Sequence, residues 1–323
     1  MVNEPVELRR RPRRRGSAPR GMANGYPGSS RRLRKPHVMQ MRSTLCRLFP
    51  WLTVMALAGG PTVAAADDVD TCARQSGDAA IAACSRAIAS GEFSGEELAK
   101  IYLNRGVEHR SKSELDSAIA DYSEAIRVDP RRVAAYFNRG NAWQAKGEFD
   151  RAAADYSETI RLDPGHARAY NNRGVTWSEK GAADRAIADY NEAIRLDPNY
   201  VEAYSNRGNA WIAKGDRERA IGDYDSALRL DPKYVEAYDN RGDAFLAKGD
   251  LDSAIADYDE AIRLNPKFAK SYYNRGVARE KKRSLPEALS DFEAYGQLVP
   301  SDPDGPKSMA RVKTELSAMT GRR

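Results

Sequence analysis

The sequence is poor in the residue types that most often carry catalysis and metal binding. It has three histidines and three cysteines in 323 residues, and the histidines lie far apart in the chain. No P-loop, Gly-x-Ser-x-Gly or His-Glu-x-x-His motif occurs. We therefore predict that the protein is not an enzyme, and that it has no cofactor, no catalytic residue and no metal site.

Acidic residues are almost missing from the N-terminal part of the chain. Residues 1–66 carry 13 Lys and Arg residues against two acidic ones, which leaves 39 basic and 44 acidic residues in the remainder. The net charge of +6 therefore comes from this tail alone. Residues 1–40 mix arginine runs with Gly, Ser and Pro, a composition that predicts disorder. This segment is either an arm that binds nucleic acid or a membrane, or sequence upstream of a translation start at Met22, Met39 or Met41 instead of Met1.

Long apolar runs are also scarce, and the one apolar stretch near the N-terminus is short. Arg42 and Arg47 precede the apolar residues 48–58, a Gly-Gly-Pro break follows, and Ala64–Ala66 supply a small-x-small pattern. The arrangement of residues 41–66 is typical of a bacterial Sec signal peptide cleaved after Ala66. A membrane span needs about 20 apolar residues. We expect a periplasmic protein, with an inner-membrane anchor as the alternative.

Cleavage at that site would leave Cys72 and Cys84 as the cysteines of the mature chain. Two cysteines in an oxidising compartment allow one bridge. We predict a disulfide between them.

The most prominent feature of the sequence is a period of 34 residues. If position 1 is residue 99, 133, 167, 201, 235 or 269, then position 4 is always Tyr, position 8 Gly, position 20 Ala and position 32 Pro. Position 24 is Tyr five times and then Phe292. Positions 4, 8 and 11 share one helical face, as do positions 20, 24 and 27. Small residues at positions 8 and 20 allow two helices to approach closely, and the Pro ends the second helix.

This pattern resembles the tetratricopeptide repeat family over residues 99–302. The resemblance implies an all-α, right-handed superhelical solenoid of stacked helix-turn-helix hairpins. We divide the chain into a basic segment (1–40), a signal peptide (41–66), an atypical N-terminal capping hairpin (67–98), six repeats (99–132, 133–166, 167–200, 201–234, 235–268 and 269–302) and a C-terminal capping helix (303–323).

Position 7, where the family usually has Leu, is Arg in every repeat, and position 23 is always Asp. The residues are Arg105, Arg139, Arg173, Arg207, Arg241 and Arg275, with Asp121, Asp155, Asp189, Asp223, Asp257 and Asp291. An unpaired charge at a packed position costs several kcal/mol, so we predict structural ion pairs in preference to a row of anion-binding arginines. The pattern does not tell whether each Arg pairs within its repeat or with the preceding one.

Position 6 is Asn in all six repeats: Asn104, Asn138, Asn172, Asn206, Asn240 and Asn274. The resemblance implies that these residues face a concave groove and hold a bound peptide. The alternative is a local side-chain hydrogen bond near the helix start.

Variable positions of the first helices line the groove in the family. Here they include Phe137 for an apolar side chain, and an acidic cluster formed by Glu202, Glu236, Asp239 and Asp243. The acids favour a basic ligand, and the alternative is a solvated surface. Asn209, Asn240 and Lys270 match a carboxylate-binding pattern of some family members, but Ser205 and Asn274 depart from it.

We therefore expect a periplasmic scaffold or adaptor that binds another protein or a peptide, without nucleic acid and without stable membrane insertion. The alternatives are an enzyme accessory protein or a membrane-anchored assembly factor of the cell envelope, and more remotely a nucleic-acid binder that uses the basic arm.

Overall fold

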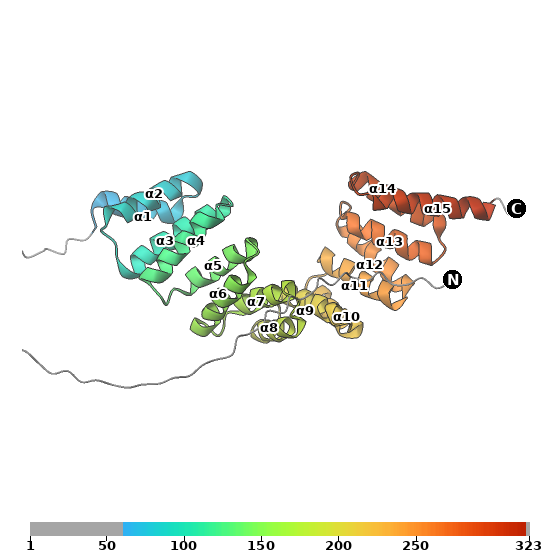
Figure 1. The fold of residues 1–323 in the computed structure, drawn as a ribbon, viewed down its shortest axis with the longest axis horizontal. Coiled ribbons are helices and arrows are strands. Elements are labelled where there is room, and N and C mark those ends of the chain that lie inside the picture. Colours follow the sequence, from blue (N-terminus) through green and yellow to red (C-terminus); the bar gives the residue numbers. More distant parts are fainter. Residues whose placement is uncertain (1–60, 321–323) are drawn as a thin grey trace, which may run out of the picture. The chain divides into compact units, whose positions relative to one another are not determined.

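The computed structural model describes residues 61–320, so the predicted basic segment and most of the predicted signal peptide lie outside the described residues. Within the described range the chain forms only helices and no strand (Figure 1). The helices are α1 (Val63–Arg74), α2 (Gly77–Ser90), α3 (Gly95–Ser111), α4 (Leu115–Val128), α5 (Val133–Ala145), α6 (Phe149–Leu162), α7 (Ala167–Glu179), α8 (Ala183–Leu196), α9 (Val201–Ala213), α10 (Arg217–Leu230), α11 (Val235–Lys248), α12 (Leu251–Leu264), α13 (Ala269–Lys281), α14 (Leu285–Leu298) and α15 (Asp304–Thr320).

The helices pair into consecutive hairpins, and each hairpin packs on the next along the chain (Figure 1). The six predicted repeats correspond to α3–α4 through α13–α14. First helices of neighbouring hairpins also contact each other directly, from α1 with α3 to α11 with α13. They therefore form one continuous face, which we call the first-helix face. The prediction of an all-α repeat solenoid is confirmed.

A glycine at position 15 makes the turn inside most hairpins. Gly147 and Gly249 have φ values of 75° and 84°, a left-handed conformation that costs a glycine little. Ser113 and Arg283 take the same conformation in the first and last repeats, with φ values of 63° and 65°. The turn geometry is therefore kept at both ends even where glycine is absent.

The aromatic residue at position 24 fills the centre of each hairpin. Tyr122, Tyr258 and Phe292 are each 0% exposed. A Cβ atom on Gly106 would lie 2.6 Å from Tyr122 Cε1, and one on Gly242 would lie 2.7 Å from Tyr258 Cε1. Position 8 is thus glycine because the buried ring lies directly against the backbone of the facing helix.

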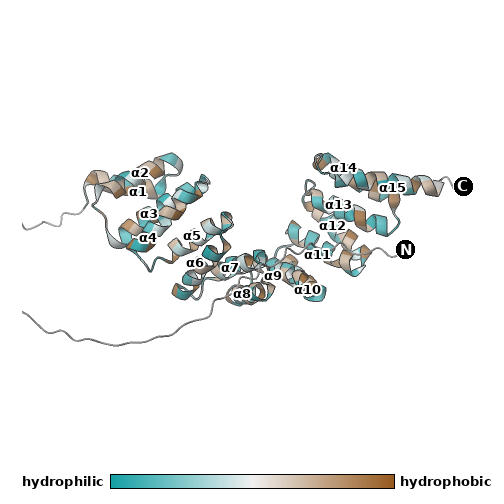
Figure 2. Cartoon of the chain, viewed as in Figure 1, coloured by the Kyte–Doolittle hydropathy of each residue, from teal (hydrophilic) through white to brown (hydrophobic). Residues whose placement is uncertain are grey.

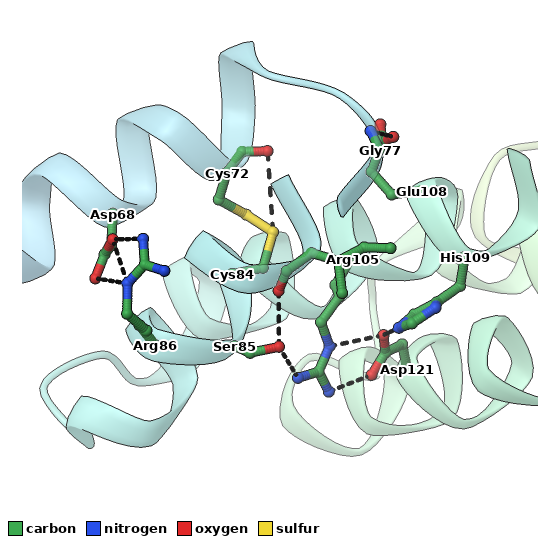
Figure 3. Close-up of a disulfide and its surroundings, with 11 residues drawn as sticks. Asp68, Cys72, Gly77, Cys84, Ser85, Arg86, Arg105, Glu108, His109 and Asp121 are labelled. Carbon is green, nitrogen blue, oxygen red and sulfur yellow. Dashed lines mark hydrogen bonds and ion pairs between the residues drawn. A yellow bond between two sulfur atoms is a disulfide. The ribbon is translucent and has the colours of Figure 1, made fainter. Parts of the chain in front are cut away.

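The N-terminal hairpin, α1–α2, carries the two cysteines of the described residues. The sulfur atoms of Cys72 and Cys84 lie at bonding distance, 2.10 Å, and join α1 to α2 (Figure 3). Helix α1 begins at Val63, so the last residues of the predicted signal peptide form its first turn, with Ala65 buried. Cleavage after Ala66 would shorten α1 by that turn and leave both cysteines in place.

The C-terminal helix α15 packs against α14 through Met309, Val312 and Leu316. Apolar and polar residues are mixed along every helix (Figure 2), as expected for helices that bury one face. Over residues 61–320, none of the helices combines the length and the apolar character that a membrane crossing requires.

Candidate functional site

Each position-7 arginine is held by three side-chain contacts. Arg173 donates from Nε and Nη2 to Asp189 at 2.8 and 2.7 Å, and from Nη1 to Ser157 Oγ at 2.9 Å. Asp189 belongs to the same repeat and Ser157 to the preceding second helix. The guanidinium carbon also lies 5.6 Å from the centre of the Tyr170 ring, which adds a cation–π contact.

The same two-pronged pair with the Asp of its own repeat recurs for all six arginines. The pairs are Arg105–Asp121, Arg139–Asp155, Arg173–Asp189, Arg207–Asp223, Arg241–Asp257 and Arg275–Asp291. Figure 3 shows the first of them, where Arg105 reaches Asp121 and also Ser85 of α2. Each arginine thus connects its own hairpin to the preceding one.

The partner from the preceding hairpin changes along the chain. It is Ser85, Ser123 or Ser157 in the first three repeats, and Asn191, Asp225 or Asp259 in the last three. Burial raises the pKa of Asp257, the charge of Asp225 adds to this, and Arg241 opposes it. Carboxylates therefore accumulate around the arginines only toward the C-terminal end.

A second row of ion pairs runs along the hairpin turns. Each lysine at position 14 reaches back to an exposed carboxylate at the start of the preceding second helix. The pairs are Lys112–Asp78, Lys146–Asp116, Lys180–Asp150, Lys214–Asp184, Lys248–Glu218 and Lys282–Asp252. Exposed pairs contribute about 0–1 kcal/mol each to stability. The row is notable because the same pair recurs in all six repeats.

The asparagines at position 6 do not share one environment. Asn172 Nδ2 donates to Asn141 Oδ1 at 2.9 Å, and Asn274 Nδ2 donates to Asp243 Oδ1 at 2.7 Å, both across to the preceding first helix. Asn206 Nδ2 donates to Asn171 Oδ1 at 3.1 Å. These bonds join neighbouring hairpins, which neither of the two readings of the sequence anticipated.

The other three position-6 asparagines make no such hydrogen bond to a neighbouring first helix among the described residues. Asn104 lines a hollow between α1 and α3, together with Val69 and Ile101. Asn138 and Asn240 have no side-chain hydrogen bond to any described residue.

Two residues expected to line the groove are buried instead. Phe137 is 7% exposed, its ring lies 4.7 Å from the His166 ring between centroids, and Arg168 lies over it. Asp239 is 1% exposed. Both stand at position 5, which packs against the next hairpin. The expectation that they offer an exposed surface to a ligand is therefore wrong.

Two acids of the cluster have a basic neighbour in the next repeat. Lys270 Nζ lies 2.6 Å from Asp239 Oδ2 and 2.9 Å from Asp243 Oδ2, while Ser271 Oγ donates to Asp239 Oδ1 at 2.6 Å. Burial raises the pKa of Asp239 against the effect of Lys270 and Ser271. Burial lowers the pKa of Lys270, but the two carboxylates outweigh it and the net shift is upward. Lys270 is therefore already paired with carboxylates of the protein itself.

Glu202 and Glu236 remain exposed at position 2 of α9 and α11. Among the described residues, neither carboxylate has an ion pair or a side-chain hydrogen bond. Tyr234, which immediately precedes α11, connects them: burial raises the pKa of its phenol, Glu236 and Glu202 raise it further, and Ser205 lowers it. Both carboxylates, at position 2 of the adjacent first helices α9 and α11, thus act on the same phenol.

A hollow of about 240 Å³ opens further along the same two helices. Its polar lining includes Asn209, Asn240, Asp243 and Arg217, and Ile212 is apolar and 39% exposed. Asn209 also lines a neighbouring hollow of about 280 Å³ between α7 and α9. The sequence reading missed Ile212 and Arg217, although an apolar residue at position 12 of α9 was a usable signal.

Sequence models of known protein families match this chain. A tetratricopeptide repeat model matches residues 103–165 and 144–201, and a TPR repeat model matches residues 208–249 and 242–282, together more than half of the chain. Among curated proteins, none matches this chain in sequence.

Several solved structures share the fold. PilF of Pseudomonas aeruginosa superposes with a TM-score of 0.58 and 18% identity, over 67% of this chain and 97% of PilF. A tetratricopeptide repeat protein from Parabacteroides merdae gives 0.57 and 18%, over 77% of this chain and 96% of the other. A chain of the Cut9–Hcn1 hetero-tetramer of the APC/C gives 0.58 and 18%, over 66% of this chain and 42% of that one, so this chain spans less than half its length.

Identities this low support the fold alone. The fold is that of an interaction scaffold, since repeats of this kind generally bind other proteins and do not catalyse reactions. The repeat-model matches, the 34-residue hairpins and the stacked first helices agree, and the chain belongs to the tetratricopeptide repeat family.

Proposed function

We propose that the protein is an exported, non-catalytic scaffold that binds a partner protein or peptide on its first-helix face. A basic side chain of the partner would lie between Glu202 and Glu236, beside Tyr234. The observation that carries this proposal is that neither exposed carboxylate forms an ion pair among residues 61–320, although Arg168, at the same position of the preceding first helix, acts on the Tyr200 phenol together with Glu202.

The recurring basic residues of the repeats support this assignment, because they are already paired whereas Glu202 and Glu236 are not paired within residues 61–320. The six position-7 arginines, the position-14 lysines and Lys270 all contact carboxylates of the protein itself. A cation from a partner would meet Glu202 and Glu236 without first displacing an internal lysine or arginine. The hollow beside Asn209 and Ile212 lies on the same helices and could take a neighbouring side chain of the partner.

The proposed periplasmic location rests on the signal-like residues 41–66 and on the cysteine pair in α1–α2. Its test is the N-terminal sequence of the protein recovered from the cell envelope, which we expect to begin at Asp67. An N-terminus at Met41 or upstream in that fraction would support the inner-membrane anchor instead.

The binding proposal is tested with a displayed peptide library selected against the full chain. We expect enrichment of peptides with Lys or Arg, and about fivefold weaker binding of those peptides to the Glu202→Gln/Glu236→Gln variant, because two exposed ion pairs are lost. Glu148→Gln/Glu287→Gln is the matched control, since both residues are exposed acids elsewhere on the protein. Equal binding to both variants would exclude this subsite.

A further inference from the structure

Position 17, the first residue of each second helix, is apolar and large in four of the six repeats. The residues there are Leu115, Phe149, Leu251 and Leu285. All four are partly or fully buried, so this position normally contributes to packing. Repeats 3 and 4 are the exceptions, with Ala183 and Arg217. These two central repeats therefore lack a large apolar side chain that the other repeats supply.

Each exception lines a hollow. Ala183 lines the hollow of about 280 Å³ between α7 and α9, and Arg217 lines the hollow of about 240 Å³ between α9 and α11. On α9, Ala213 faces the first hollow, Ile212 faces the second, and Asn209 lines both. Because α9 contacts α7 as well as α11, the C-terminal end of α9 separates the two hollows.

The lining of both hollows is rich in small apolar residues. Ala183, Ala210 and Ala213 line one hollow, and Ala244 and Ala247 line the other. Apolar groups beside unfilled space lose the contacts that a packed side chain would make with them. A partner can supply these contacts, so the lining favours apolar side chains as occupants.

The charged residues of the hollow between α9 and α11 exclude a basic occupant. Arg217 is exposed and has no ion pair in the described chain, and its charge disfavours a second cation beside it. Asp243, the acid of the same hollow, is already paired with Lys270. Ile212 adds apolar surface that is 39% exposed. This end of α9 and α11 therefore suits a neutral apolar group, unlike the acidic start of the same helices.

We propose that each hollow receives one apolar side chain of the same basic partner peptide. The inference rests on the proposed function, because the charge of the partner is taken from Glu202 and Glu236. Glu202 and Ile212 are ten residues apart on α9, which corresponds to about 15 Å along the helix. An extended peptide covers that distance in about five residues. The partner thus carries a Lys or Arg about five residues from an apolar residue.

The second apolar residue follows from the separation of the hollows. They lie on either side of one helix, and neighbouring helix axes are about 8–10 Å apart. In the polyproline II conformation, residues three apart lie on the same side of the peptide at a distance of about 9 Å. The two apolar side chains are therefore three residues apart in the partner.

The test uses the peptide N-acetyl-Lys-Ser-Pro-Ser-Pro-Leu-Ser-Pro-Leu amide, which has the base and both apolar residues at these spacings. A second probe has Ala in place of both Leu residues, and a third has Gln in place of Lys. Each probe is titrated into the full chain with ¹³C-labelled methyl groups on Ala and Ile. The methyl resonances of Ile212, Ala183 and Ala213 report occupation of the hollows.

We expect the Leu probe to shift these resonances and to bind about tenfold more tightly than the Ala probe, because two Leu side chains become partly buried. Equal affinities of the Leu and Ala probes would overturn the inference. So would the absence of any shift of the three methyl resonances with all probes.

Ala183→Leu and Arg217→Leu restore the side chain that position 17 has in other repeats. Each should fill one hollow from within and weaken binding of the Leu probe about threefold without lowering the thermal midpoint. Ala188→Leu is the matched control and should bind the probe normally, since Ala188 is an exposed alanine of the same helix α8 and lines neither of the two hollows. If one position-17 variant misfolds, the other serves. Unchanged binding to the folded variants contradicts the assignment.

The Gln probe separates this inference from the proposed function. If it binds as tightly as the Leu probe while Ala183→Leu still weakens binding, the hollows bind apolar side chains and the role of Glu202 and Glu236 is wrong. If Lys is needed but the Leu and Ala probes bind equally, this inference alone is wrong.

Discussion

The position-7 arginine has different partners in repeats 1–3 and in repeats 4–6. In the first group each arginine meets one carboxylate and one serine, as Arg139 meets Asp155 and Ser123. In repeats 5 and 6 it meets two carboxylates, as Arg241 meets Asp257 and Asp225. All six repeats keep the same pairing geometry, repeat 4 replaces the serine by the neutral Asn191, and repeats 5 and 6 add a second carboxylate.

The first-helix face changes in the same direction. Position 5 is apolar at Leu103 and Phe137 and acidic at Asp239, and position 9 changes from Val107 to Asp243. At these two positions the N-terminal end is therefore more apolar and the C-terminal end more acidic. The difference shows that shared contacts fix the stacking of hairpins, while the remaining positions are free to set the charge of each end.

The largest effect should come from removing the arginine. We expect Arg139→Met to lower the free energy of unfolding by about 3–5 kcal/mol, because it leaves Asp155 buried without its cation. Arg241→Met should cost more, because Asp225 and Asp257 would then face each other. Urea unfolding measures the loss, and hydrogen exchange assigns it to a repeat, since repeat arrays need not unfold in one step.

Arg139→Met/Asp155→Leu is the control for that measurement. It removes both charges, so it should recover most of the loss. Equal losses for the two single arginine variants would show that the third partner does not matter.

A smaller effect, equal at both ends, is expected from the shared glycine contact. Gly140→Ala and Gly242→Ala would place Cβ atoms 2.8 and 2.7 Å from the rings of Tyr156 and Tyr258. Overpacking of this kind costs about 1–3 kcal/mol. Matching decreases in the urea midpoint would support a common stacking contact, whereas a much larger loss at one end would contradict it.

The smallest effect concerns pH. The pKa of Asp257 is raised above its ordinary value of 3.8, so the folded state binds the proton more tightly than the unfolded chain does. The free energy of unfolding of repeat 5 should therefore increase as pH falls from the raised pKa of Asp257 to 3.8, and decrease as pH rises over the same range. Asp225→Ser should weaken this dependence by less than about 1 kcal/mol.

Ser123→Asp should create the same dependence around Asp155 in repeat 2. Carboxyl chemical shifts of Asp257 and Asp155 across the titration measure both changes. A pKa of Asp257 that does not move in Asp225→Ser would show that burial alone raises it.

Sequence reasoning was strong where one residue type recurs at one position. The position-8 glycine, the position-24 aromatic residue and the closing proline together predicted helical hairpins, because only their joint presence satisfies close helix packing. The arginine and aspartate series likewise indicated pairing, although a one-dimensional pattern could not show that each arginine also reaches the preceding second helix.

The candidate site was harder because its residues do not repeat. Position 5 varies from Leu103 through Phe137 to Asp239, and this variation was interpreted as ligand contact when it reflects packing against the next hairpin. Lys270 was not recognised as the partner of two acids, since it lies in a different repeat from both.

The two rows of ion pairs have a mechanical consequence. Neighbouring hairpins are joined by polar contacts at two separate points: the arginine near the middle of the first helix and the lysine at the turn. Apolar packing between the helices sets the angle between hairpins, and two polar contacts at separate points resist a change in that angle. The lysine row is exposed, so salt at physiological strength screens it, and the bending stiffness of the array should fall with ionic strength before its stability does.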